Sequence, residues 1–231
     1  MNRKQIVLLC LLGVIFLGDL YLMNIQHPFR FITKALLIPI IFFYYYSSIS
    51  TTGSGPRNIY IGLFFSWIGD ILLTIDKPLF FILGLISFLI THIFYIIYFI
   101  RLKGHKTSFL KQRPVMLLVI IAYFVELLHI LWPGLGSMKG PVLIYAMVIS
   151  TMFAAAAWQY EKIENKPAIY FIAGSFLFML SDSILAIGKF VHPFANGGMM
   201  VMTTYVLAQF LIVNGSIYFQ KSNPLNHSEI E

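Results

Sequence analysis

Blocks of about 20 apolar residues, separated by short polar breaks, run through nearly the whole chain. An α-helix of that length spans the ~30 Å hydrocarbon core of a bilayer, whereas a membrane β-barrel needs strands in which apolar and polar side chains alternate. These blocks are apolar on every side, so we predict an all-α polytopic membrane bundle with eight transmembrane helices. The predicted helices cover residues 5–23, 30–48, 58–76, 79–100, 114–132, 141–160, 167–188 and 199–219.

The low content of charge excludes a water-soluble globule. Charged residues make up 11% of the 231-residue chain and hydrophobic residues 59%, whereas a soluble domain carries ~25% charged residues. The single cysteine, Cys10, excludes an intrachain disulfide and any multi-cysteine metal site. The net charge of +7 reflects basic residues in the breaks between blocks, which indicates contact with lipid headgroups rather than a nucleic-acid partner.

Basic residues also predict the orientation of the bundle, because they are enriched in the cytoplasmic loops of membrane proteins. With eight helices, eleven of the 16 Lys and Arg residues fall on the side of the two termini, which we therefore place in the cytoplasm. The other side carries Arg30, Lys34, Lys77, Lys139 and Lys189. The first block continues to Met23 with no Ala-x-Ala-like cleavage site, so we expect a retained helix and not a signal peptide.

The breaks between the apolar blocks are too short to hold a soluble domain. We expect one transmembrane domain over residues 1–219, followed by a polar, disordered C-terminal tail over residues 220–231. We place such a chain in a cell membrane, as a multi-pass protein of a bacterial inner membrane. Any chemistry must then be carried out by side chains within the helix bundle or in its short loops.

Four carboxylic acids lie well inside predicted helices, away from their ends, where a charge in mid-bilayer costs at least ~2.5 kcal/mol. They are Asp19, Asp70, Glu126 and Asp182. They fall on the first, third, fifth and seventh helices, each about 4–6 residues before the helix ends, or ~6–9 Å below the same surface. Lys34, about five residues into the second helix, enters from that surface as well. We therefore predict a polar chamber that opens toward the outer leaflet.

Three of these acids follow a small residue, which allows close packing between helices. The pairs are Gly18-Asp19, Gly69-Asp70 and Ser181-Asp182, and their similarity indicates a weak internal repeat of helix pairs. Other polar residues share helix faces through spacings of three or four. These are His92 with Tyr95, Tyr205 with Gln209, and Glu126 with His129.

Four segments with distinctive polar residues follow one another along the chain. They are Trp67-Ile-Gly-Asp70-Ile-Leu-Leu, Leu83-Gly-Leu-Ile-Ser-Phe-Leu-Ile-Thr-His92-Ile-Phe-Tyr95, Phe178-Met-Leu-Ser-Asp182-Ser-Ile-Leu-Ala and Thr204-Tyr205-Val-Leu-Ala-Gln209-Phe-Leu. Together with the length and the helix count, they make the chain similar to the YhhN-like family of membrane lysoplasmalogenases. The family pattern usually reads Lys-Pro where this chain has Lys34-Ala35.

The resemblance implies an eight-helix hydrolase that cleaves the vinyl ether bond of lysoplasmalogens to a fatty aldehyde and a glycerophospho-alcohol. The two aspartate motifs of the family match Asp70 and Asp182, which the resemblance marks as catalytic. The chemistry fits these residues, because protonation of the vinyl carbon gives an oxocarbenium ion, and glycosidases handle a related ion with two carboxyl groups. One carboxyl would donate the proton, and the other would stabilise the cation or activate water; we expect no cofactor.

The remaining polar residues are predicted to support this pair. Lys34 suits the lipid phosphate as a point charge, or it extends to the membrane interface like an ordinary amphipathic lysine. Asp19 is interpreted as a supporting partner or as the counter-ion of Lys34. Two roles are possible for a further set of polar residues. They could orient the carboxyl pair and the lipid headgroup, or they could form hydrogen bonds between helices. These residues are His92, Tyr95, Tyr205 and Gln209.

Other functions are compatible with the same residues. A small proton-coupled transporter would use the same acids with Lys34 and His92, but few polar residues continue to the cytoplasmic side. A different lipid-modifying or lipid-binding role is also open, and the two aspartates could be structural. A di-iron site is disfavoured because Glu-x-x-His occurs once, at Glu126–His129, and such a bundle needs it twice. The expected partners are a lysophospholipid substrate and membrane lipids.

Overall fold

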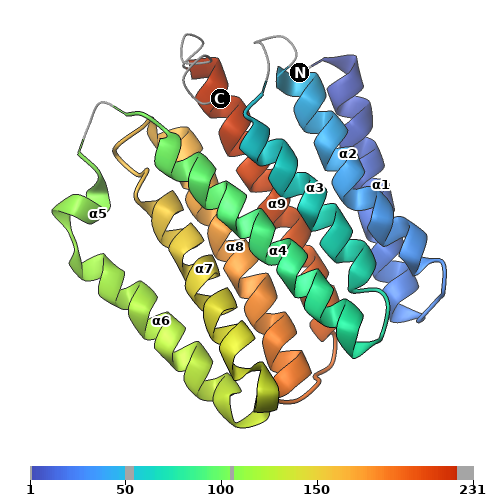
Figure 1. Ribbon diagram of the computed structural model, residues 1–231. Helices are drawn as coiled ribbons and strands as arrows, with labels where there is room; N and C mark the ends of the chain where they lie inside the picture. Colours follow the sequence, from blue (N-terminus) through green and yellow to red (C-terminus); the bar gives the residue numbers. More distant parts are fainter. Residues whose placement is uncertain (1, 50–54, 105–106, 223–231) are drawn as a thin grey trace. The chain divides into compact units, whose positions relative to one another are not determined.

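The computed structural model describes residues 2–49, 55–104 and 107–222, and the regular structure within these ranges is helical (Figure 1). The chain packs as two compact units, the first formed by the described residues up to Tyr98 and from Ser216 onward, the second by Phe99–Gly215. The first unit contains α1 (Arg3–Asn24), α2 (Arg30–Ile49), α3 (Arg57–Leu72) and most of α4 (Pro78–Arg101). The second contains α5 (Phe109–Gln112), α6 (Val115–Leu131), η1 (Trp132–Gly134), η2 (Gly136–Met138), α7 (Lys139–Ala157), α8 (Asn165–Phe190) and most of α9 (Gly197–Ser222).

In the first unit, α1 begins at a capping box. The Asn2 side chain accepts a hydrogen bond from the first turn, and the Gln5 side chain accepts one in return from the Asn2 N–H at 2.8 Å. After α1, Gln26 adopts a φ of +51° and turns the chain toward α2. Helix α2 packs against both α1 and α3. Polar side chains from these three helices can therefore meet around α2.

Glycines on α3 allow α4 to approach closely. A Cβ atom added at Gly62 would lie 2.3 Å from Cε1 of Tyr95, and one added at Gly69 would lie 2.7 Å from Cε2 of Phe88. A larger residue at either position would have to displace an aromatic ring. The close helix packing predicted beside Asp70 is therefore confirmed.

The small residues beside the other two aspartates behave differently from Gly69. A Cβ atom added at Gly18 would meet nothing within 4 Å, so the glycine before Asp19 does not mark a close contact. Ser181, before Asp182, is buried and its hydroxyl donates to the carbonyl oxygen of Val201 on α9 at 3.1 Å. The prediction of close packing therefore fails at Gly18, while Ser181 does make an interhelical contact.

Buried hydroxyl groups join three helices within the first unit. The Tyr45 and Ser216 hydroxyls of α2 and α9 lie 2.7 Å apart, and the Tyr98 hydroxyl of α4 donates to Ser216 Oγ at 2.9 Å. Gln220 Nε2 donates to the Tyr45 hydroxyl at 3.4 Å. Such side-chain hydrogen bonds help hold helices together where there is no water to compete for them.

The second unit has its own apolar core. Leu131, Leu135 and Val142 form a buried cluster at the connection between α6 and α7. Gly174 of α8 lies so close to α9 that an added Cβ atom would be 2.7 Å from Cγ1 of Ile212. Helix α8 therefore packs closely on α9 through its glycine, much as α3 packs on α4.

The predicted helix ends agree with the structure to within three residues, except at the end of α3. The third helix was predicted to reach residue 76, but α3 ends at Leu72 and contains 16 residues. The chain turns immediately afterwards, with Lys77 N–H donating to the carbonyl of Ile75 at 2.8 Å, and α4 begins at Pro78. Residues 220–222, predicted to lie in the tail, are helical, and residues 223–231 lie outside the described residues.

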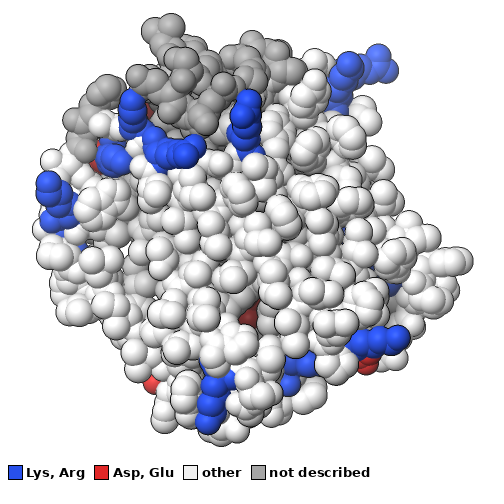
Figure 2. All heavy atoms as spheres, viewed as in Figure 1, with Lys and Arg blue, Asp and Glu red and all other residues white. Residues whose placement is uncertain are grey.

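Seven of the described helices are long and apolar enough to cross a membrane, and α3 is the long helix that falls short. Their outer faces are apolar too, as the 66% exposed Leu17 of α1 and the 65% exposed Val119 of α6 show. Most of the surface in view in Figure 2 belongs to residues other than Lys, Arg, Asp and Glu. Water would be a poor solvent for such a surface, as expected of a multi-pass membrane protein. Eight crossings and cytoplasmic termini stay predictions.

Candidate active site

The first candidate group is a buried ion pair between α2 and α3. Lys34 Nζ lies 3.8 Å from Asp70 Oδ1, and the two residues are 7% and 2% exposed. Opposite charges at this separation attract strongly where water is excluded. The Lys34 side chain is thus directed to a carboxylate within the first unit, which does not support the interpretation that it extends to the membrane interface.

Trp67 holds α3 against α2 beside this ion pair. Its indole Nε1–H donates a hydrogen bond to the carbonyl oxygen of Ala35 at 2.9 Å. Trp67 precedes Asp70 by three residues and so lies on the same side of α3, while Ala35 directly follows Lys34. This hydrogen bond fixes the distance between the two backbones where the ion pair forms.

Asp19 on α1 has a different set of partners. Its Oδ1 accepts a hydrogen bond from the Thr33 hydroxyl at 2.9 Å and lies 3.8 Å from Nε of Arg30. Asp19 is fully buried. Asp19 was interpreted as a supporting partner or as the counter-ion of Lys34, but the ion pair of Lys34 is formed with Asp70, and Asp19 contacts Arg30.

His92 and Tyr95 of α4 are both fully buried in the structure. The Tyr95 ring lies over Gly62 of α3, so its position is explained by the packing of α4 on α3. Thr91, the neighbour of His92, donates to the Gly62 carbonyl at 3.0 Å and is 3.1 Å from the Ser66 hydroxyl. Any role of His92 and Tyr95 in chemistry stays a prediction.

The second candidate group lies in the second unit, around Asp182 of α8. The Tyr145 hydroxyl of α7 donates a hydrogen bond to Asp182 Oδ2. One residue further on, Ser183 and Tyr123 of α6 bring their hydroxyls to 2.6 Å from each other. Three helices of this unit therefore meet at Asp182 and its neighbour through hydroxyl groups.

Tyr205 and Gln209 of α9 are both buried in the structure. Tyr205 is 3% exposed and Gln209 0%. The Tyr205 ring stands edge-on to Phe178, with ring centroids 5.4 Å apart. Because Phe178 lies one helical turn before Asp182, Tyr205 is held close to this part of α8.

Glu126 and His129 do not belong to either buried group. Both residues are exposed on α6, whereas Asp19 and Asp70 are buried and Asp182 is half-buried. Glu126 is therefore not one of the buried acids, although it was predicted at the same depth as the other three.

Among the described residues, no three His, Cys, Asp or Glu side chains gather as a metal site requires. Asp70 and Asp182 belong to different units, and their pairing stays a prediction.

The sequence interpretation missed three residues: Tyr145, Arg30 and Thr33. The reasoning by depth that singled out Lys34, about five residues into a helix that enters from the outer side, applies equally to Tyr145 in the predicted helix 141–160. Tyr145 was overlooked because a tyrosine inside an apolar block resembles ordinary core packing. Arg30 and Thr33 were overlooked because residues at a helix start are usually solvated.

We expect Lys34→Met to destabilise the protein, because it leaves Asp70 as a buried charge without its counter-ion, a change that costs ~3–5 kcal/mol. Adding Asp70→Asn should recover much of that loss. The check is the thermal melting temperature of the purified variants in detergent. A double variant less stable than Lys34→Met alone would show that the two side chains do not stabilise each other as an ion pair.

Comparison with known proteins places this chain in a family. A family model described as the YhhN family matches residues 29–216, a range that contains both Asp70 and Asp182. The chain is similar to a protein of Bos taurus named lysoplasmalogenase TMEM86A, with 29% identity over 177 residues that cover 72% of this chain and 68% of the relative. The protein of the same name from Homo sapiens is 27% identical over 183 residues, covering 74% and 68%.

A bacterial relative shows a similar level of likeness. A protein named lysoplasmalogenase from Mycobacterium tuberculosis is 28% identical over 177 residues, covering 75% of this chain and 65% of the relative. No solved structure matches this chain. Proteins of bacterial and mammalian origin that carry the same name thus resemble this sequence.

Proposed function

This chain belongs to the YhhN family, and we propose that it is a membrane lysoplasmalogenase that hydrolyses the vinyl ether bond of its substrate. The observation that carries the proposal is the family match over residues 29–216, because it contains both candidate carboxyls, Asp70 and Asp182. The relatives named lysoplasmalogenase favour this hydrolase over the transporter considered as an alternative.

The proposed reaction begins with transfer of a proton from a carboxyl group to the vinyl carbon that is not bonded to oxygen. The resulting oxocarbenium ion is stabilised by the second group, a carboxylate, as in glycosidases. Water then adds to the carbon next to the ether oxygen and loses a proton, which gives a hemiacetal. The hemiacetal collapses to a fatty aldehyde and a glycerophospho-alcohol, and the first carboxyl is reprotonated.

Asp70 and Asp182 are the two carboxyls we assign to this reaction. Lys34 lies 3.8 Å from Asp70 and provides a fixed positive charge beside it, while the Tyr145 hydroxyl orients the Asp182 carboxyl through a hydrogen bond. Asp70 is buried among helices, where fixed charges and dipoles act more strongly on a developing cation than they do in water.

The membrane setting of the proposal follows the sequence. We propose that the chain crosses the membrane eight times, with α3 as the shortest crossing, and that both termini are cytoplasmic. The site would open toward the outer leaflet of a bacterial inner membrane. A single-tailed lysophospholipid can then enter from the bilayer with its headgroup at the surface. Its vinyl ether lies just below the headgroup, at the depth predicted for the carboxyls.

The direct test is hydrolysis by the purified protein in detergent micelles. With a 1-alkenyl lysophospholipid we expect fatty aldehyde to be released in step with the glycerophospho-alcohol. The matched 1-alkyl lysophospholipid, which lacks the double bond, cannot accept the proton and should remain intact. If no aldehyde appears, or if the alkyl lipid is cleaved equally, the proposed reaction is wrong.

Isotope labelling examines the proton-transfer step itself. In D₂O, the aldehyde should carry one deuterium on the carbon next to its carbonyl group, provided that it is trapped at once by reduction to the alcohol. Aldehyde released without that deuterium would rule out protonation of the vinyl carbon.

The Tyr145 hydroxyl should matter for turnover. Hydrogen bonds to charged groups are worth about 1.5–3 kcal/mol, so we expect Tyr145→Phe to lower kcat by about 10-fold or more. Tyr123→Phe is the matched control, because it removes a hydroxyl bonded to Ser183 instead of Asp182. Initial rates of aldehyde release measure both variants, and equal effects of the two changes would contradict a specific role of Tyr145.

A further inference from the structure

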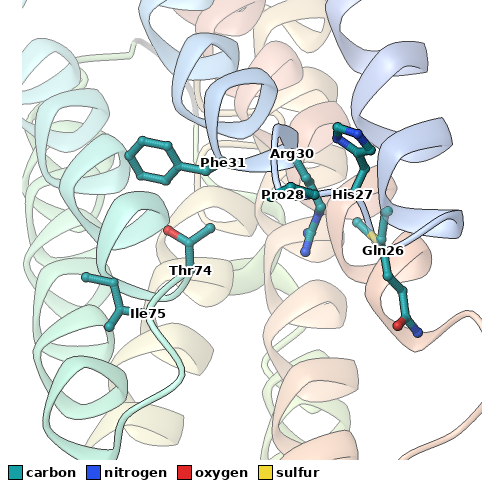
Figure 3. A pocket seen from close by; sticks show the side chains of 8 residues that line it. Gln26, His27, Pro28, Arg30, Phe31, Thr74 and Ile75 are labelled. Carbon is teal, nitrogen blue, oxygen red and sulfur yellow. The ribbon is translucent and has the colours of Figure 1, made fainter.

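The turns after α1 and α3 line an open pocket of about 480 Å³ within the first unit (Figure 3). This volume is in the range of sites that hold small ligands, ~300–1,000 Å³. The apolar part of the lining includes Phe31 and Ile75, and polar groups come from Gln26, His27, Arg30 and Thr74. The lining residues are all described, and among them Arg30 carries a full positive charge and none is a carboxylate.

Arg30 is both accessible and held in place. Its side chain is 30% exposed, whereas the Asp19 side chain that pairs with it is fully buried. The contact with Asp19 is made through Nε, the inner nitrogen of the guanidinium, and the two terminal nitrogens lie further along the side chain, which extends away from α2 in Figure 3. The hydrogen bond from Thr33 holds Asp19 at 2.9 Å, so the guanidinium is oriented before a ligand arrives.

The chemistry of this pocket suits an oxygen anion. The planar guanidinium fork matches two oxygens of a phosphate and is the protein group best suited to paired hydrogen bonds with it. His27 accepts a hydrogen bond at Nδ1 from the Phe29 backbone N–H at 3.3 Å, which leaves Nε2 of the neutral ring as its N–H donor. The lining of the pocket therefore offers an anionic ligand a charged donor, Arg30, and a neutral donor, His27, from two parts of the turn.

The pocket also lies at a suitable distance from the proposed chemistry. Arg30 and Lys34 are four residues apart on α2, a rise of ~6 Å along the helix, and Lys34 is paired with Asp70. In a lysoplasmalogen the phosphate and the vinyl ether are joined to opposite ends of a three-carbon glycerol, a separation comparable with one helical turn of ~5.4 Å. A phosphate at Arg30 would therefore place the vinyl ether at the level of Asp70.

We infer that this pocket is the headgroup site and that Arg30, positioned by Asp19, binds the phosphodiester of the lysophospholipid. Binding the lipid phosphate was one of the two roles predicted for Lys34, but Lys34 instead forms an ion pair with Asp70. The inference rests on the proposed function for the identity of the lipid, but the binding of a glycerophosphodiester in the pocket can be measured without any turnover.

The probe is sn-glycero-3-phosphoethanolamine, the water-soluble headgroup part of such a lipid, titrated into the purified full-length protein by calorimetry in detergent. We expect saturable binding that Arg30→Gln weakens by at least tenfold, because the paired, charge-assisted hydrogen bonds are lost. Lys77→Gln is the matched control, since it removes one exposed positive charge from the turn after α3, close in sequence to the lining residues Thr74 and Ile75, but does not itself line the pocket. Its affinity should stay within twofold.

Two further measurements keep the result unambiguous. The double variant Asp19→Asn/Arg30→Gln leaves no unpaired buried carboxylate behind, and it should fold and bind as weakly as Arg30→Gln. Inorganic phosphate at the same concentration should bind more weakly than the glycerophosphodiester. The assignment would be overturned if Arg30→Gln bound the glycerophosphodiester with unchanged affinity, or if Lys77→Gln lost as much affinity as Arg30→Gln. It would also be overturned if inorganic phosphate bound as tightly as the glycerophosphodiester.

Kinetics separate this inference from the proposed function. If the protein hydrolyses lysoplasmalogen, Arg30→Gln should raise KM by about tenfold while kcat changes little, because the phosphate contact is the same in substrate and transition state. Absent hydrolysis in the wild-type protein would contradict the proposed function alone. Hydrolysis with an unchanged KM in Arg30→Gln would contradict the headgroup site alone.

Discussion

We expect Asp70→Asn and Asp182→Asn each to lower kcat for lysoplasmalogen hydrolysis by about 10²–10⁴-fold, the usual contribution of a general acid or base. Asparagine keeps the shape of the side chain but cannot donate a carboxylic proton or carry the negative charge that faces the oxocarbenium ion. The measurement is aldehyde release at saturating substrate, with protein concentrations high enough to quantify the residual rate. The double variant should be little slower than the slower single variant, because both groups act in one step.

Glu126→Gln is the control for this pair of variants. Glu126 lies in a predicted transmembrane helix like the two aspartates, but it is exposed on α6, and its neutral variant should keep kcat within about threefold, since surface changes usually have small effects. The melting temperatures of all variants show whether a loss of rate comes from unfolding. If both aspartate variants keep most of their activity as folded proteins, the two-carboxyl mechanism is wrong.

A large effect on stability is expected for Gly134→Ala in the second unit. An added Cβ atom there would lie 1.7 Å from the carbonyl oxygen of Phe190, so the residue that ends η1 meets the last residue of α8 with no space between them. Overpacking of side chains costs ~1–3 kcal/mol, and here the obstacle is backbone, which no rotamer change can move. We expect a loss above ~3 kcal/mol, seen as a strongly lowered melting temperature in detergent.

Gly188→Ala provides the comparison for this substitution. Gly188 lies in the last turn of α8, and a Cβ atom added there would lie 4.0 Å from its nearest neighbour, Cε1 of Phe194. Alanine is favoured over glycine in helices by ~0.5–1 kcal/mol, so Gly188→Ala should melt at the wild-type temperature or slightly above it. Similar melting of both variants would mean that the contact between Gly134 and Phe190 contributes little to the stability of the fold.

Much of the helical architecture was predictable, because the length of an apolar block is a local property of the sequence. A block of about 20 apolar residues with a proline or glycine at its end has few alternatives in a membrane. The exception, the early end of α3 at Leu72, arises because Thr74 and Ile75 still read as part of an apolar block. In the structure, the N–H and the hydroxyl of Thr74 both donate to the carbonyl oxygen of Ile71, and the N–H of Ile75 donates to that of Leu72. These residues therefore form a turn instead of continuing the helix.

The candidate site was predictable in part, for the same reason. The prediction that Lys34 and Asp70 lie at one depth is consistent with their separation of 3.8 Å, and Tyr145 could have been found by counting residues from the start of its helix. The contact partners of these residues could not be predicted by counting. The spacing of residues along the helices does not indicate that Lys34 pairs with Asp70 while Asp19 contacts Arg30 and Thr33.

The sequence by itself determined that this is a membrane helix bundle, and it predicted how deep each polar side chain lies, because every residue adds ~1.5 Å along its helix. The tertiary structure alone decided which way each helix is rotated. Glu126 was predicted at the same depth as Asp70, yet it is exposed while Asp70 is buried. Rotation and neighbours depend on contacts between segments far apart in the chain, such as Gly62 against Tyr95, and those contacts form only when the helices pack.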